Sequence, residues 1–115
     1  MKQRISYNEK VSRILEPPYF KNMDLEFGIS NTNDQLEVLK FIYGNDVTIT
    51  PLPSMNIRSN FGFCIGEIRN PFGMELYYEN SFGSWIKKEY DSNGYITNYE
   101  DSNGQTNMIL NYHNI

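Results

Sequence analysis

Short strand-like runs alternate with four similar turns in the second half of the chain. Each turn begins with Asn or Asp and ends with glycine: Asn70-Pro71-Phe72-Gly73, Asn80-Ser81-Phe82-Gly83, Asp91-Ser92-Asn93-Gly94 and Asp101-Ser102-Asn103-Gly104. This order is typical of a type I turn that a left-handed glycine closes into a hairpin. The runs between the turns are rich in Tyr, Trp, Ile and Thr, which favour strands. The pattern predicts a five-stranded antiparallel meander with strands at 61–69, 74–79, 84–90, 95–100 and 105–112.

The turn type also predicts which residues face each other across the hairpins, namely Asn80 and Ser84, Asp91 and Tyr95, and Asp101 and Gln105. One face of the sheet is then mostly apolar and is the expected core: Cys64, Ile68, Met74, Leu76, Tyr78, Ile86, Tyr90, Ile96, Met108, Leu110 and Tyr112, interrupted by Lys88 and Asn98. The other face mixes aromatic and charged side chains: Glu67, Arg69, Glu75, Tyr77, Glu79, Trp85, Lys87, Glu89, Tyr95, Thr97, Tyr99 and Asn107. We expect this second face to be open to water or to a partner.

The first half of the chain carries two helical patterns. A capping box at 6–9 precedes an apolar stripe at Val11, Ile14 and Leu15, and the two prolines at 17–18 end this helix at about Leu15. A second capping box at 32–35 precedes apolar residues at helical spacing, which predicts a helix over 33–43 that ends at Gly44. Residues 25–29 and 47–50 alternate like short strands.

These elements predict an α+β fold, in which two short N-terminal helices pack on one face of a roughly five-stranded antiparallel β-meander. At 115 residues the chain has the length of one domain, with a helical and mixed cap at 1–60 and the meander at 61–115. The sequence has no apolar run near the roughly 20 residues of a membrane span, its first residues lack the apolar core of a signal peptide, and Cys64 is its one cysteine. We therefore expect a cytoplasmic protein without a membrane partner.

The chain shows no pattern of catalytic or metal-binding residues. The one histidine, His113, lies near the C-terminus, and Cys64 falls on the expected core face. Zinc-type Cys and His pairs are absent from the sequence, and turn formation accounts for the Asp91 and Asp101 tetrapeptides. The carboxylates of Glu75, Glu79 and Glu89 share a predicted face, as a pair of catalytic carboxylates would. Ordinary charge pairing between neighbouring strands explains them equally well. We expect a non-enzymatic protein with no cofactor and no metal.

The aromatic and charged face is the candidate binding surface. We expect its binding residues to be Tyr77, Trp85, Lys87, Tyr95, Tyr99, Glu79 and Glu89. Tyr and Trp dominate interface hot spots, although the rings could equally belong to a repeat that merely covers the sheet. The net charge of −4, from 14 acidic and 10 basic residues, argues against autonomous nucleic-acid binding and is compatible with a basic partner.

An internal repeat supports the hairpin assignment: Tyr78-Glu79-Asn80-Ser81-Phe82-Gly83 recurs as Tyr99-Glu100-Asp101-Ser102-Asn103-Gly104. Residues 77–104 resemble the short tyrosine-rich tandem β-repeats, akin to the YD repeats of RHS-type proteins, of bacterial and phage proteins. The resemblance implies a twisted antiparallel scaffold.

By the same analogy the chain resembles small phage or mobile-element inhibitors of the anti-CRISPR type. The implied function is stoichiometric binding to a bacterial defence nuclease, such as an RNA-targeting type VI CRISPR effector with its guide RNA, in the host cytoplasm. Two alternatives stay open: an immunity or structural partner of an RHS-type toxin, and a sponge for a small nucleotide signal. A homodimer through the last strand is also open.

Overall fold

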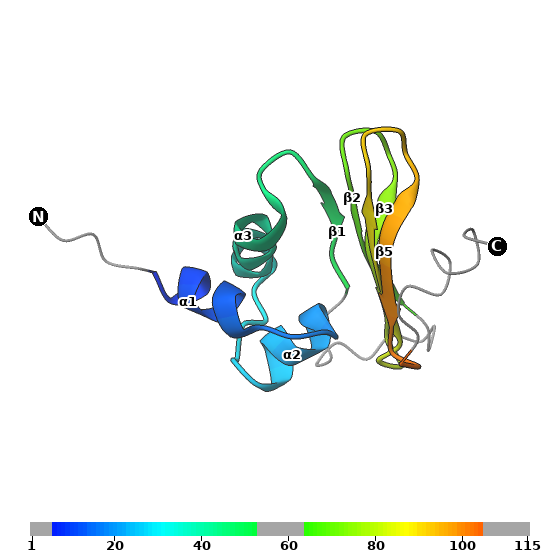
Figure 1. The fold of residues 1–115 in the computed structure, drawn as a ribbon. Helices are drawn as coiled ribbons and strands as arrows, with labels where there is room; N and C mark the ends of the chain where they lie inside the picture. The colour runs from blue at the N-terminus through cyan, green and yellow to red at the C-terminus, as the bar shows by residue number, and fades with distance from the viewer. Residues whose placement is uncertain (1–5, 53–63, 105–115) are drawn as a thin grey trace, which may run out of the picture.

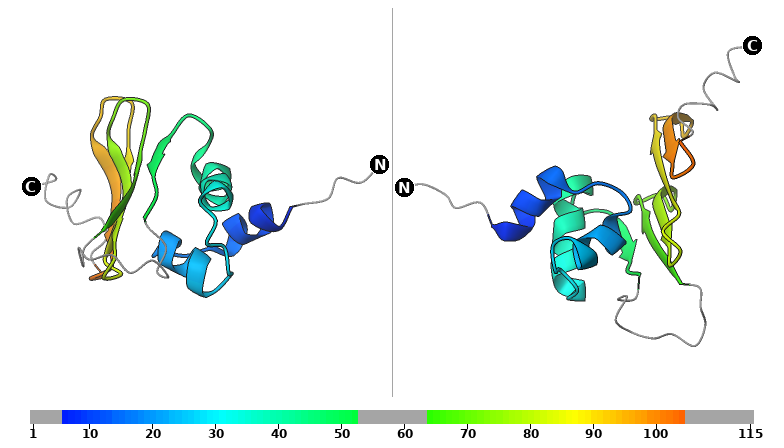
Figure 2. Two further views of the ribbon diagram at one scale, coloured as in Figure 1. Left: turned by 180° about the vertical axis from the view of Figure 1, so that it is seen from behind. Right: turned by 90° about the horizontal axis from the view of Figure 1, so that it is seen from below.

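A computed structural model describes residues 6–52 and 64–104 and places them in three short helices and one antiparallel sheet (Figure 1). The helices are α1 (Tyr7–Ile14), α2 (Tyr19–Leu25) and α3 (Thr32–Tyr43). The strands, whose order in the sheet follows their order in the chain, are β1 (Thr48–Thr50), β2 (Ile65–Arg69), β3 (Glu75–Asn80), β4 (Trp85–Tyr90) and β5 (Ile96–Asp101). The views from behind and below show the three helices on one side of the sheet, with β5 farthest from them (Figure 2).

The α+β fold with helices on one face of a five-stranded meander is therefore confirmed, with changes in its elements. The segment after the two prolines is the helix α2, which ends at Leu25, and residues 26–29 form a turn and irregular backbone, so the strand expected at 25–29 is wrong. The first of the five strands is β1, which lies in the expected segment 47–50. The strand expected at 105–112 lies outside the described residues.

Local capping explains where α1 and α3 begin and end. The Ser6 hydroxyl accepts a hydrogen bond from the backbone N–H of Glu9 at 3.1 Å, as the capping box predicts. The side chain of Asn31 accepts from the N–H of Asp34 at 3.2 Å, so α3 begins one residue earlier than the expected box. Gly44 then ends α3 with a φ of 97°, a value that favours glycine.

The hairpin turns form as their sequences predict. The backbone N–H of Asn80 donates to the Ser84 carbonyl at 3.0 Å, and that of Asp91 donates to the Tyr95 carbonyl at 2.9 Å. The side-chain oxygen of Asp91 accepts from the N–H of Asn93 at 2.9 Å, which is the local Asx bond expected at such a turn. Gly94 closes this turn at a φ of 87°. The expected Asp101–Gln105 pair lies outside the described residues.

The internal repeat is visible as repeated hydrogen bonds. Ser81 and the backbone of Cys64 exchange two bonds, from Ser81 N–H to the Cys64 carbonyl at 2.9 Å and from Cys64 N–H to the Ser81 hydroxyl at 3.0 Å. Ser102 and Trp85 exchange the same two bonds, at 3.0 and 3.2 Å. In each case the serine reaches 17 residues back along the chain. The repeat in the sequence is therefore a repeat of hairpin geometry.

Two β-bulges change the faces that the turns alone predict. Ile68 pairs with Tyr77 while Arg69 pairs with Glu75, so Leu76 is an extra residue in β3. Tyr90 pairs with Ile96 while Glu89 pairs with Asn98, so Thr97 is an extra residue in β5. Because side chains alternate between faces along a strand, each bulge reverses the assignment beyond it. Tyr99 consequently lies on the face opposite Tyr77.

The core lies between the helices and the face of the sheet that carries Tyr77 and Glu79. Its buried apolar members come from the helices, the adjoining segments, β2 and β3: Val11, Leu15, Tyr19, Phe20, Met23, Ile29, Val38, Leu39, Leu52, Ile68 and Tyr77. The expected core face is therefore wrong, although Ile68 is buried as predicted. Tyr78, Ile86, Tyr90 and Ile96 lie half-buried on the face that no described helix covers. The buried face can carry the polar groups of Tyr77 and Glu79 because backbone N–H groups of α2 hydrogen-bond to them.

Candidate functional site

A buried pair of polar side chains fixes the start of α2 against the sheet. Glu79 accepts hydrogen bonds from the backbone N–H groups of Phe20 at 2.8 Å and Lys21 at 2.9 Å, one on each carboxylate oxygen. The Tyr77 hydroxyl donates to Glu79 at 2.6 Å and accepts from the N–H of Tyr19 at 2.8 Å. Pro18, the N-cap of α2, has no side-chain hydrogen bond to the helix, so the sheet supplies the cap.

Burial dominates the electrostatics of this pair. Burial raises the pKa of Glu79, and the hydrogen bonds from Tyr77, Phe20 and Lys21 oppose that rise. Burial and the neighbouring Glu79 also raise the pKa of the Tyr77 hydroxyl. The two side chains thus bond to each other and to three backbone N–H groups of α2. Tyr77 and Glu79, two of the expected binding residues, are therefore fully buried against α2.

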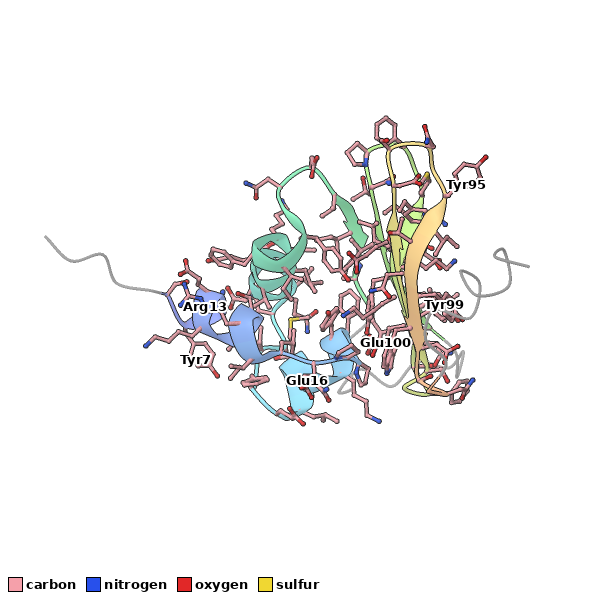
Figure 3. The ribbon with its side chains drawn as sticks, viewed as in Figure 1. Tyr7, Arg13, Glu16, Tyr95, Tyr99 and Glu100 are labelled. Atoms are coloured by element: carbon pink, nitrogen blue, oxygen red, sulfur yellow. The ribbon has the colours of Figure 1, made fainter. Side chains whose placement is uncertain are left out.

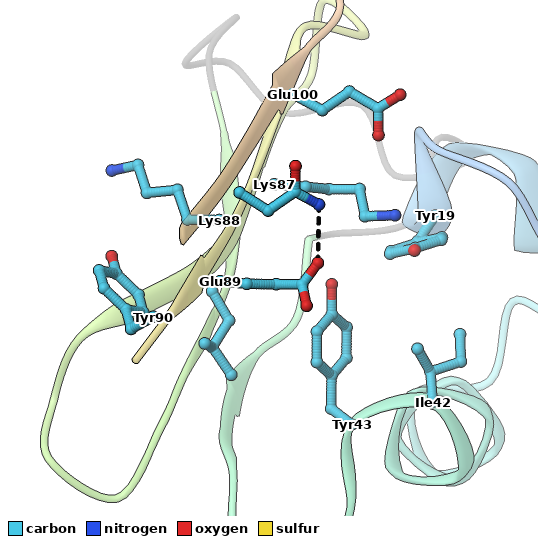
Figure 4. Close-up of a pocket in the computed structure, with 10 residues that line it drawn as sticks. Tyr19, Ile42, Tyr43, Lys87, Lys88, Glu89, Tyr90 and Glu100 are labelled. Atoms are coloured by element: carbon cyan, nitrogen blue, oxygen red, sulfur yellow. Dashed lines mark hydrogen bonds between the residues drawn. The ribbon is translucent and has the colours of Figure 1, made fainter. Parts of the chain in front are cut away.

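A cleft of about 430 Å³ lies beside this pair, between the helices and the β4–β5 hairpin (Figure 4). It runs from the middle of the sheet toward the end that carries the 70–73 and 91–94 turns. Tyr19 and Tyr43 enter it from α2 and α3, and Lys87, Glu89 and Glu100 enter it from β4 and β5. The remaining lining residues are Ile42, Leu76, Lys88, Tyr90 and Asn98.

Two tyrosine rings form the helix side of the cleft. The rings of Tyr19 and Tyr43 meet edge to face, with their centroids 6.3 Å apart. Tyr19 also packs on the Tyr77 ring at 4.6 Å, which couples the cleft wall to the buried pair. Burial, with smaller contributions from Tyr19 and Glu89, raises the pKa of the Tyr43 hydroxyl. The Tyr43 phenol is therefore neutral at physiological pH.

Charged side chains form the strand side of the cleft. The Lys87 ammonium lies 5.7 Å from the centroid of the Tyr19 ring, a cation–π distance. The Asn98 side chain donates to Glu89 at 2.8 Å. Among the ion pairs between described residues, none includes Lys87, Glu89 or Glu100. The Lys88 side chain points to the other side of β4, where it pairs with Glu75 at 3.4 Å, so the side chains that enter the cleft carry two carboxylates and one ammonium.

The structure separates the binding residues that the sequence grouped on one face. Lys87 and Glu89 line the cleft, and Trp85 is half-buried against the core. Tyr99 lies on the uncovered face, where its hydroxyl donates to Asp101 at 2.9 Å, while the next residue, Glu100, points to the helix side (Figure 3). Tyr95 projects from the end of the β4–β5 hairpin (Figure 3).

The sequence interpretation missed Tyr19, Tyr43, Asn98 and Glu100 as lining residues. The internal repeat contains a signal for Glu100, because it aligns that residue with Glu79. No local signal points to the two tyrosines, which reach the cleft from helices distant in the sequence.

Large aromatic side chains are exposed at the sheet end next to the cleft. Phe72, in the 70–73 turn, is 87% exposed, and Tyr95, beside the 91–94 turn, is 71% exposed. These turns lie at the same end because each joins consecutive antiparallel strands, with the 80–83 turn at the other end. Phe82, in that distant turn, is 71% exposed. We call the end with Phe72 and Tyr95 the aromatic end.

Within residues 6–52 and 64–104, no group of three or more His, Cys, Asp and Glu side chains could hold a metal ion. Over the same residues, no helix has the length and apolar character needed to cross a membrane. The chain matches no protein-family model, no curated protein and no solved structure.

Proposed function

We propose that the protein is a non-catalytic binding protein that attaches to another protein through its aromatic end. The observation that carries this proposal is the exposure of Phe72 and Tyr95, 87% and 71%, beside a cleft at one end of the sheet. Aromatic side chains are enriched at the centres of protein interfaces because they bury a large area at a low entropic cost. A concave cleft with polar groups next to them adds a way to fix the orientation of the partner.

As the partner, we propose a bacterial defence nuclease, in the manner of an anti-CRISPR inhibitor of an RNA-targeting type VI effector. Two observations support this choice. The tyrosine-rich repeat resembles repeats of bacterial and phage proteins, and Ser81 and Ser102 form equivalent bonds in its two copies. The net charge of −4 complements the basic channel in which such an effector holds its guide RNA.

A titration of purified type VI effector with its guide RNA tests this proposal. We expect cleavage of a reporter RNA to fall in proportion to added protein and to stop near one equivalent. The double variant Phe72→Ser, Tyr95→Ser should lose most of this inhibition. Phe82→Ser is the matched control, because it removes an aromatic ring of equal exposure to Tyr95 at the opposite end.

Two results would contradict the proposal at different levels. Full cleavage activity with excess wild-type protein would reject the effector as the partner. Equal inhibition by the double variant and by wild type would reject the aromatic end as the binding surface. Circular dichroism of each variant establishes that a loss of inhibition does not reflect unfolding.

A small-molecule sponge is the second candidate function, and only the volume of the cleft supports it, because two carboxylates against one ammonium disfavour an anionic nucleotide. The cleft volume of about 430 Å³ lies within the range of ligand pockets. Heating the purified protein and analysing the supernatant for a released nucleotide distinguishes this candidate. A nucleotide released in equimolar amount would favour the sponge over the inhibitor.

A further inference from the structure

Glu79 and Glu100 occupy equivalent positions in the two copies of the internal repeat. Each precedes the Asn or Asp that opens its turn, and each is followed two residues later by the serine that bonds 17 residues back. Glu100 pairs across the sheet with Lys87, which pairs in turn with the buried Tyr77, so it lies on the helix side like Glu79. The second copy of the repeat therefore presents a second carboxylate to the same side of the sheet.

The first copy shows what such a carboxylate can bind. Glu79 holds two parallel N–H donors, with Phe20 N–H on one oxygen at 2.8 Å and Lys21 N–H on the other at 2.9 Å. A guanidinium group binds a carboxylate in the same way, with one N–H donor on each oxygen. The Glu79 site is thus an internal example of fork recognition at this position of the repeat.

The second copy has the carboxylate without the helix. β5 is the strand farthest from the helices, and among the described residues Glu100 lines the cleft without the bonds to helix N–H groups that Glu79 accepts. No ion pair between described residues includes Glu100. Glu89 adds a second carboxylate to the same cleft, and the tyrosine rings of Tyr19 and Tyr43 close its other side.

We propose that the cleft binds an arginine side chain of the protein partner, with Glu100 accepting the two N–H donors of the guanidinium. This rests on the proposed function and names the chemistry of the partner's contact. Two carboxylates against one ammonium favour a cation over an anion, and Glu89 supplies a further acceptor. A planar guanidinium also stacks on aromatic rings, which Tyr19 and Tyr43 provide, whereas a lysine ammonium lacks both the fork and the flat face.

Titration of the full chain with Nα-acetyl-arginine amide, followed by NMR, tests the proposal without the partner. We expect the signals of Tyr43 and Glu100 to shift with a saturable dependence on concentration. The same amide of citrulline has nearly the same shape without the charge. We expect it to bind about fivefold more weakly, because it loses one favourable ion pair. The lysine amide should also bind more weakly than the arginine amide.

Glu100→Gln should weaken arginine amide binding by about fivefold or more, because it removes one acceptor oxygen and the charge. Glu37→Gln is the matched control, since Glu37 is an exposed carboxylate on α3 that does not line the cleft. We expect its affinity to equal that of wild type. Equal binding of the arginine and citrulline amides, or wild-type affinity in Glu100→Gln, would overturn the proposal.

Different results would reject the arginine site in the cleft and the inhibition of the effector. If arginine amide does not bind but the effector is inhibited, the inference is wrong and the proposed function stands. If arginine amide binds through Glu100 but the effector is not inhibited, the cleft still recognises a guanidinium and the effector is the wrong partner.

Discussion

The Tyr77 hydroxyl donates a hydrogen bond to the Glu79 carboxylate at 2.6 Å and accepts one from the N–H of Tyr19 at 2.8 Å. Through these bonds the phenol connects a strand to the first residue of α2, 58 positions earlier in the chain. The helix α2 has seven residues, and an isolated helix of that length is unstable in water. The contact with β3 therefore holds α2 in place and positions the Tyr19 wall of the cleft.

Tyr77→Phe should lower the free energy of unfolding by about 1–3 kcal/mol, since it leaves the buried N–H of Tyr19 without an acceptor and removes a donor from Glu79. Urea denaturation followed by circular dichroism measures this change. Tyr99→Phe is the control, because the Tyr99 hydroxyl bonds Asp101 on the uncovered face, and we expect a cost below about 1 kcal/mol. An equal cost for both variants would contradict the role of Tyr77.

The stability advantage of wild type over Glu79→Gln should grow as the pH falls from 8 toward 4. Burial raises the pKa of Glu79 above its ordinary value of 4.5. A carboxyl whose pKa is higher in the folded protein than in the unfolded protein contributes stability at low pH. That contribution is complete below the pKa in the unfolded protein and is lost as the pH rises through the pKa in the folded protein. Glutamine does not titrate, so the difference between the two proteins isolates this contribution. Urea denaturation at each pH measures it, and a difference that shrinks on acidification would show that the hydrogen bonds outweigh burial.

Gly66→Ala should destabilise the fold by about 1–3 kcal/mol through overpacking. A methyl group at this position in β2 would lie 2.8 Å from the ring of Phe20 and 2.9 Å from Cβ of Leu52. Both neighbours belong to the buried core and have no free space to move into. A thermal melt measures the loss, and unchanged stability would mean that α2 packs less closely on β2 than the structure shows.

Lys87→Met should strengthen binding of Nα-acetyl-arginine amide several-fold. The Lys87 ammonium lies 5.7 Å from the Tyr19 ring, where it repels an entering cation. Methionine keeps much of the length and apolar character of the side chain without the charge. The NMR titration measures the change, and weaker binding in this variant would indicate that Lys87 contacts the ligand favourably.

Local chemistry explains why much of the fold is readable in the sequence. Several features depend only on contacts within about five residues, as the Asp91–Asn93 bond does. These are the Asx–glycine turns, the register beside each turn, the N-cap of α1 and the C-cap of α3 at Gly44. Ser81 and Ser102 form repeated bonds because the chain itself repeats. These features do not require the rest of the protein to be in place.

The choice of buried face, the helix α2 and the cleft depend on contacts between distant segments. Counting apolar residues favours the Tyr78 and Ile86 face, since it treats a carboxylate such as Glu79 as a group that needs water. In the folded chain the N–H groups of Phe20 and Lys21, 59 and 58 residues away, replace that water, so the polar face can be buried. The bulge at Thr97 then places Glu100 on that face and Tyr99 on the other, and the bulge at Leu76 brings Ile68 to the same face as Tyr77. Tertiary contacts therefore override the face that the local pattern favours, because the cost of burying a polar group depends on the partner that the fold brings to it.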